Sequence, residues 1–146
     1  MADGVFNIAL GAVVEMFNDS GSAGIIMLLK ANEAEATLVD RTDIADLLAE
    51  AGNTEADFTN YVRKTGLTGT VTVDNTNELV DVDVPDQTFS AAGGASNNTL
   101  TKAIVCYENA AADATRIPLT HHDFAVTTDG NDLELQVATA GFFRAT

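Results

Sequence analysis

Two adjacent histidines and an aspartate, His121, His122 and Asp123, are the residues of this sequence whose types first suggest chemistry. Imidazole and carboxylate groups are common zinc ligands. Neighbouring residues of an extended chain point to opposite faces, so the two histidines would not easily reach one ion. No further His or Cys cluster completes a site. We therefore expect one histidine to be hydrogen-bonded near the start of a strand and the other to be exposed. A small hydrolase that uses either histidine is the last of the alternatives.

A second candidate is an acidic group formed by Asp81, Asp83 and Asp86, with Asp74 nearby. Calcium and magnesium require several converging oxygen ligands, and Asp81 and Asp83 share one face at the i, i+2 spacing. The spacing of an EF-hand loop is absent. The pattern favours a solvated acidic face, and we predict no metal site.

The glycine-rich stretch at residues 92–95 is a third candidate, for a nucleotide. It lacks the Lys-Ser/Thr of a P-loop and the spacing of a dinucleotide fingerprint. The hydroxyl and thiol groups of Ser90, Ser96, Thr99 and Cys106 lie in no nucleophile-elbow pattern. We therefore predict no catalytic residue and no cofactor, and expect that the chain is not an enzyme.

The net charge of the chain limits the classes of partner that it can bind. Twenty-two acids stand against seven scattered bases, and the net charge is −15. Nucleic-acid binding needs clustered cations, so no direct contact with DNA or RNA is expected. No stretch approaches the roughly 18–20 apolar residues of a membrane span, and the N-terminus lacks a basic signal region. We expect a chain made in the cytoplasm, not exported by itself and without membrane contact.

The elements that would position these residues are mainly strands. Residues 100–107, 124–128 and 133–137 form three strand-like runs, which we expect to be the framework of a sheet. Asp-Gly at residues 129–130 predicts a hairpin between the last two runs. Cys106, the only cysteine, lies in an apolar run and is expected to be a small buried side chain.

The N-terminal third is strongly apolar. Residues 5–17 are interpreted as a strand bent at Gly11, and residues 25–29 as a short buried strand. The turn cluster at residues 18–22 would join them in a hairpin. Helix is the competing interpretation for both runs because Ala, Leu and Met favour it.

Two short helices are expected next. Residues 42–51 carry apolar side chains at helical spacing, with Thr42 or Asp43 as the N-terminal cap. Residues 54–62 favour a helical turn followed by extended chain, and a strand over residues 58–64 is the competing interpretation. The first helix would pack its apolar face on a sheet.

The remaining elements are β-strands and loops. Strands are expected over residues 70–73 and 80–84, with a brief one at 88–90. A loop of small residues follows at 91–98, and a C-terminal tail begins at residue 138. The valines of the second strand would face the core and Asp81 and Asp83 the solvent. Phe142 and Phe143 would lie in the core or at an interface.

We therefore expect residues 1–146 to form a single, mainly β domain, a β-sandwich or jelly-roll-like fold with one or two short helices at about 42–51 and 54–62. The N-terminal strand region and the C-terminal tail are the predicted places for contacts between subunits.

The sequence resembles small virion structural proteins of tailed bacteriophages. The resemblance covers about the last two-thirds of the chain, in the segments 57–64, 85–89, 91–98, 104–107, 118–124 and 141–144. It implies a non-enzymatic particle component, first a capsid decoration or cement protein on the outer surface of the head. A tail, tail-tip or fibre-associated protein is the alternative.

The partners implied are the major capsid protein or other virion proteins, together with further copies of the chain as a homo-oligomer on the particle. The acidic charge suits a location outside the shell. A carbohydrate- or receptor-binding β-sandwich module is another alternative. Such modules use exposed Trp or Tyr, and this chain has no Trp and only Tyr61 and Tyr107.

Overall fold

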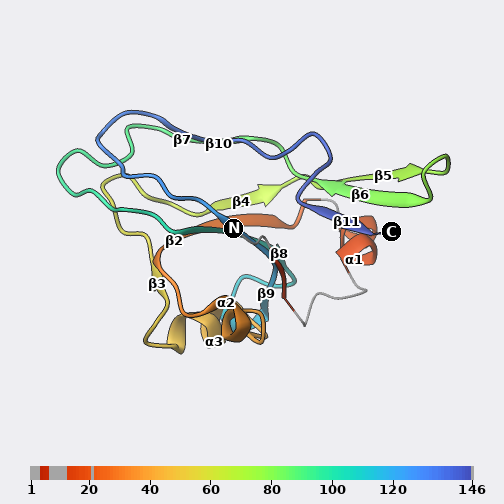
Figure 1. The fold of residues 1–146 in the computed structure, drawn as a ribbon, viewed down its shortest axis with the longest axis horizontal. Coiled ribbons are helices and arrows are strands. Elements are labelled where there is room, and N and C mark those ends of the chain that lie inside the picture. Colours follow the sequence, from red (N-terminus) through yellow and green to blue (C-terminus); the bar gives the residue numbers. More distant parts are fainter. Residues whose placement is uncertain (1–3, 7–12, 21, 146) are drawn as a thin grey trace.

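The computed structural model describes residues 4–6, 13–20 and 22–145. Strands dominate, and short helices connect or cover them (Figure 1). The strands are β1 (Gly4–Val5), β2 (Gly24–Ala31), β3 (Thr54–Glu55), β4 (Lys64–Leu67), β5 (Thr70–Asp74), β6 (Leu79–Asp83), β7 (Gln87–Phe89), β8 (Lys102–Glu108), β9 (Arg116–Asp123), β10 (Leu133–Leu135) and β11 (Phe143–Ala145).

A six-stranded sheet forms the centre of the molecule. Its strand order is β1-β9-β8-β2-β3, and β4 also pairs with β2. All of these pairs are antiparallel. The residues of β2 and β8 are buried over most of the length of each strand, because both faces of the sheet are covered. Such burial is expected for central strands.

The alternation of side chains along β2 divides the core in two. Ile26 and Leu28 belong to one apolar cluster, whereas Ile25, Met27 and Leu29 belong to another. Each of these five side chains is fully buried. Because successive side chains of a strand point to opposite faces, β2 contributes to a separate core on each face of the sheet.

Helices cover one of these faces. They are α2 (Glu35–Leu38) and α3 (Ile44–Ala49), below the sheet in Figure 1. Ile44 and Leu47 of α3 are fully buried. Asp43 caps α3 by accepting a hydrogen bond from the Asp46 backbone N–H at 2.8 Å.

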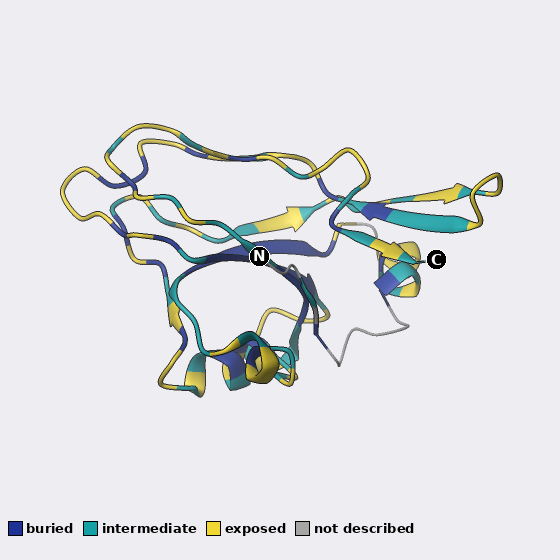
Figure 2. Cartoon of the chain, in the orientation of Figure 1, coloured by how far each residue is buried: buried dark blue, intermediate teal, exposed yellow. Residues whose placement is uncertain are grey.

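The opposite face is covered by two small sheets and a helix. β7 pairs with β10, β6 lies between β5 and β11, and α1 (Val13–Asp19) packs against β5 and β6. Figure 2 shows the buried residues concentrated in the central sheet, with the hairpin of β5 and β6 extending outward.

The prediction of a mainly β domain with short helices is confirmed, and the layered sheets correspond to the sandwich alternative. Sheets of six, two and three strands differ from the paired four-stranded sheets of a jelly roll. The expected strands at 25–29, 70–73, 80–84, 88–90 and 100–107 match β2, β5, β6, β7 and β8, and the helix at 42–51 matches α3.

Three predicted elements are wrong. The strand expected over residues 5–17 ends at Val5, and Val13–Asp19 is a helix that buries Val13 and Phe17 at the i, i+4 spacing. Residues 7–12 of that prediction, including Gly11, lie outside the described residues. The helix expected within 54–62 is instead strand β3 followed by turns and extended chain, because Thr54 and Glu55 pair with the edge of β2.

The third error is the hairpin around residues 129–130. Residues 124–128 contain a single bridge, between Thr127 and Thr99, and β10 pairs with β7. Gly130 does have the expected positive φ, 97°. The turn therefore exists, but the strand after it joins a different sheet.

Candidate functional site

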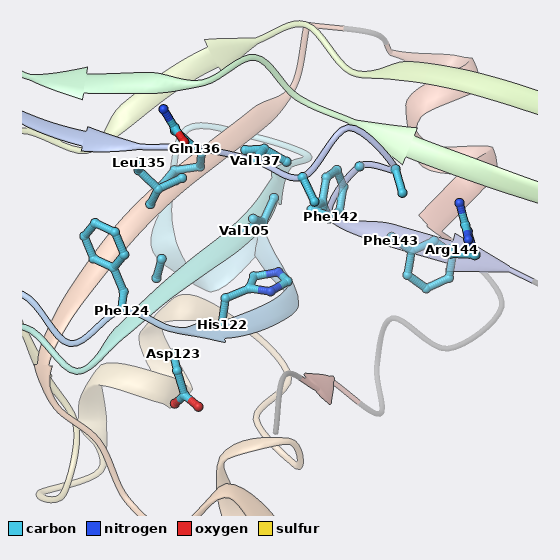
Figure 3. A pocket seen from close by; sticks show the side chains of 15 residues that line it. Val105, His122, Asp123, Phe124, Leu135, Gln136, Val137, Phe142, Phe143 and Arg144 are labelled. Atoms are coloured by element: carbon cyan, nitrogen blue, oxygen red, sulfur yellow. The ribbon is translucent and has the colours of Figure 1, made fainter. Parts of the chain in front are cut away.

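A groove lies beside the C-terminal segment (Figure 3). Its volume is about 500 Å³. One wall is the central sheet, through Ala103 and Val105 of β8 and His122 of β9. The other wall is residues 135–144, and we call this hollow the C-terminal groove.

The backbone at Gly141 shapes this wall. Gly141 has a φ of 80°, and a Cβ at this position would overlap the carbonyl group of Val82. Its N–H donates to the Ala138 carbonyl at 2.7 Å, which closes a turn. The next N–H, that of Phe142, donates to Val82 at 3.0 Å, so the chain returns to pair with β6. Only glycine fits both requirements.

Phe142 and Phe143 occupy different environments on either side of this return. Phe142 is 7% exposed and belongs to the core cluster. Its ring meets the ring of Phe17 at a centroid distance of 5.7 Å. Phe143 is only partly buried, packs against the same cluster and lines the groove.

Two polar side chains of the C-terminal groove, Arg144 and His122, are engaged in contacts within the chain. The Arg144 guanidinium donates to both oxygens of Asp81, at 2.6 and 2.9 Å, and this pair neutralises its charge. His122 Nε2 shares a 2.9 Å hydrogen bond with the Thr120 hydroxyl. Asp123, which binds Lys102, and Gln136 are the further polar residues of its wall, and the other side chains that line the groove are apolar.

His121 and His122 point to opposite faces of β9, as their adjacency predicted. His121 is 1% exposed, and neither ring nitrogen has a hydrogen-bond partner within the described ranges. Its ring packs edge-on to Phe6 at a centroid distance of 5.8 Å. Burial, followed by the nearby Lys102 charge, lowers the pKa of the His121 imidazole. The prediction that one histidine is exposed is wrong, because His122 is half-buried. Both histidines lie near the end of β9, not near the start of a strand.

An ion cluster around a buried lysine lies next to His121, and the sequence did not predict it. Lys102 is 3% exposed, and its ammonium group binds the carboxylates of Glu35 and Asp123. Burial alone would lower the pKa of Lys102, but the two carboxylates outweigh burial and raise it. A lysine inside an otherwise apolar strand was the available signal, because such a lysine must be paired.

The candidate acidic group is dispersed. Asp81 binds Arg144, and Asp74 accepts hydrogen bonds from the backbone of Thr76 and Asn77 in the hairpin turn. Asp86 accepts from the Val137 N–H at 2.7 Å.

Asp83, the remaining member of the acidic group, is half-buried. Burial, followed by the charge of Asp86, raises the pKa of its carboxyl group. Within the residues that the structure describes, no group of three His, Cys, Asp or Glu side chains is placed to hold a metal.

The glycine-rich loop uses its N–H groups inside the fold. Gly93 donates to the Thr59 carbonyl at 2.9 Å, and Gly94 donates to Asn97 Oδ1 at 2.7 Å. Their φ values are 97° and 93°. These donors are occupied, so the loop does not form a phosphate cradle.

The cysteine is also structural. Cys106 is fully buried, as predicted, and burial raises the pKa of its thiol. A thiol held protonated in an apolar core is a poor nucleophile.

Comparison with models of known protein families found no match, and comparisons with curated proteins and with solved structures found none either. None of the helices in the described ranges is long and apolar enough to cross a membrane.

Proposed function

We propose that this chain is a non-enzymatic bacteriophage virion structural protein that decorates the outer surface of the head. The observation that carries the proposal is the placement of positive charge. Every one of the seven cations is engaged within the chain: Lys30, Arg41, Arg63, Lys102, Arg116 and Arg144 in ion pairs, and Lys64 over the ring of Phe89.

The surplus of 15 negative charges is therefore what the surface presents to a partner. A protein that faces packaged DNA would need cations available for phosphate. A decoration protein outside the shell needs solubility and protein contacts, and both are compatible with an acidic surface. The acidic surface disfavours direct nucleic-acid binding for the same reason.

The contacts of several polar side chains support the same proposal. Lys102, Arg144, His122 and Asp86 are each held in contacts within the chain. The described residues thus leave no assembled acid, base and nucleophile for an enzyme. This arrangement suits a structural component.

The aromatic side chains give no support to a carbohydrate-binding module. Tyr61 donates its hydroxyl proton to Glu55 and accepts from the Leu28 N–H, at 2.8 and 3.0 Å. Tyr107 is 9% exposed. Neither ring offers the open stacking face that sugar recognition uses.

The test is the number of copies per particle. Virions that encode the chain are purified, and the chain is quantified by mass spectrometry against the major capsid protein. A ratio between one to one and one to a few supports decoration of the shell. A few copies per particle would instead support the tail or fibre alternative, and absence from particles would overturn both.

An add-back experiment separates surface binding from co-purification. Particles that lack the chain are mixed with the purified chain at low and high salt, and the bound fraction is measured after sedimentation. Because the proposed contact involves an acidic surface, we expect binding to weaken as salt increases. Failure to rebind at either salt concentration would contradict decoration of the outer surface.

A further inference from the structure

The outer edge of strand β5 is unpaired within the described ranges 4–6, 13–20 and 22–145. In the three-stranded sheet, β5 is an end strand whose five residues pair without a register shift with β6 on one side only. Thr70, Thr72 and Val73 are exposed, and Val73 is 62% exposed. The free N–H and C=O groups of such an edge are a template for another strand.

β5 is the longest outer strand of the described sheets. Strands β1 and β3 have two residues each, and β7, β10 and β11 have three each. β4 has four residues, but it carries Lys64 and a register shift against β2.

Natural proteins protect free edges with lysine, proline, a bulge or a covering segment. The β5 sequence Thr-Val-Thr-Val-Asp contains neither lysine nor proline, and its pairing with β6 is regular. The hairpin of β5 and β6 also projects from the body of the molecule, at the upper right in Figure 1. Among the residues that the structure describes, no strand pairs with this edge.

The sequence of β5 is complementary to itself. If two copies pair antiparallel about a twofold axis at Thr72, Val71 of one copy lies opposite Val73 of the other. Thr70 then lies opposite Asp74, and Thr72 lies opposite Thr72. Cross-strand β-branched pairs stabilise a sheet, and the same pattern repeats on both sides of the axis. All five residues of each strand are paired in this register.

This register also limits the repulsion between two acidic chains. The two hairpin tips point in opposite directions, so the two Asp74 carboxylates lie four positions apart, roughly 14 Å along the strand. This separation exceeds the Debye length of about 8 Å at physiological ionic strength. A cationic strand from another protein would gain little, because Asp74 is the only charged residue of β5.

We propose that two copies of this chain dimerise by antiparallel pairing of their β5 strands about Thr72. The two three-stranded sheets then form one continuous sheet across the twofold axis. The inference goes beyond the proposed function, because it concerns the purified chain without any particle. Its failure would leave the copy-number test of particle association unaffected.

The test places charges at the axis. Thr72→Asp and Thr72→Lys each put like charges directly opposite each other, whereas an equimolar mixture of the two variants pairs opposite charges. Mass is measured by light scattering and sedimentation over a range of concentrations. We expect the unmodified chain to approach twice 15.3 kDa.

Each single variant should weaken the dimer by about fivefold or more, and the mixture should restore it. Val62→Asp is the matched control. Val62 is the other large apolar side chain found exposed in the described ranges, at 71%, and it lies outside the β5–β6 hairpin. The control should leave dimerisation unchanged. Thr72 is exposed and lies opposite Asp81 of β6 in the same chain, so Thr72→Asp also adds a like charge within the hairpin. Circular dichroism therefore checks that each variant keeps its fold.

A chain that stays monomeric at all accessible concentrations would overturn the proposal, and so would open-ended aggregation. A dimer that Thr72→Asp does not weaken, or that the mixture of variants does not restore, would also overturn it. Equal weakening by Val62→Asp would place the interface elsewhere and have the same consequence.

Discussion

Gly4 of β1 lies directly against the imidazole ring of His121, its cross-strand neighbour on β9. The contact is so close that a Cβ at residue 4 would overlap Nε2. Phe6 packs edge-on against the same ring. The first strand thus closes one side of a buried histidine whose nitrogens make no hydrogen bond within the described ranges.

The first prediction concerns this contact. Gly4→Ala should destabilise the fold by about 1–3 kcal/mol, because the added methyl group displaces the ring in a filled core. In the double variant with His121→Ala the cost of the methyl group should largely disappear. Urea denaturation of the four proteins measures the coupling, and additive effects of the two substitutions would contradict the assigned contact.

The second prediction is a pH dependence. Burial lowers the pKa of folded His121, so the unfolded chain, with a histidine pKa near 6.5, binds its proton more readily. Stability should therefore fall as pH decreases below about 6.5, by up to about 1.4 kcal/mol per pH unit for this group. Lys102, Glu35, His122 and Asp123 also act electrostatically on its pKa.

The measurement is the free energy of unfolding of the chain and of His121→Leu at several pH values between 7.5 and 5, a range about the usual histidine pKa. The variant should show a flatter dependence, whatever its absolute stability. Equal slopes for the two proteins would rule out His121 as the cause.

The third prediction concerns the buried lysine. Lys102→Met should cost about 1–3 kcal/mol, because it leaves the carboxylates of Asp123 and Glu35 without their shared cation. The cost is below that of a fully buried pair, because the Asp123 side chain is 15% exposed and that of Glu35 is 39% exposed. Lys30→Met is the matched control. Lys30 binds the largely exposed Asp57, and loss of such a pair should cost at most about 1 kcal/mol. Similar losses for both variants in urea denaturation would contradict the burial of the cluster.

The fourth prediction addresses acid stability. The hydrogen bond from Arg41 is the main cause that lowers the pKa of Glu33 to about 2. The stability from this group is present above its unfolded pKa, near 4.3, and is lost as pH falls toward 2. Glu33→Gln should therefore flatten the decline of stability in that window. The free energy of unfolding is measured for both proteins at several pH values in this window. The same decline with falling pH in both would contradict the role of Glu33.

The fifth prediction separates the two C-terminal phenylalanines. Phe142→Ala should destabilise by about 3–5 kcal/mol, because it empties a core position beside Phe17. Phe143→Ala, in the wall of the C-terminal groove, should cost clearly less because that ring is only partly buried. Chemical denaturation provides both values, and an equal loss for the two variants would contradict their different burial.

Local patterns predicted the elements whose own residues carry the signal. The apolar run at 25–29 matches β2, and the alternation at 80–84 matches β6. The cap at Asp43 predicted the start of α3. In each of these elements the side chains that define the pattern are also the ones that become buried or capped, so local and tertiary preferences agree.

Strand β9 was missed because its residues look polar and include a proline. Pro118 lies at the register shift between β8 and β9, a position where a strand tolerates proline. Thr120 and His121 are buried although they are polar. Only pairing with β8 and the covering Phe6 make this segment a strand, and neither contact can be read from residues 116–123 alone.

The sequence by itself determined the mainly β character, the two-sided burial of the central strands, the inert cysteine and the acidic charge, since these follow from residue type and period. The tertiary structure decided that β10 pairs with β7, that Lys102 binds two carboxylates and that β5 is left as an open edge. Those features depend on which distant segments meet. Partners far apart in the chain are selected by the packing of the whole fold, which no short pattern encodes.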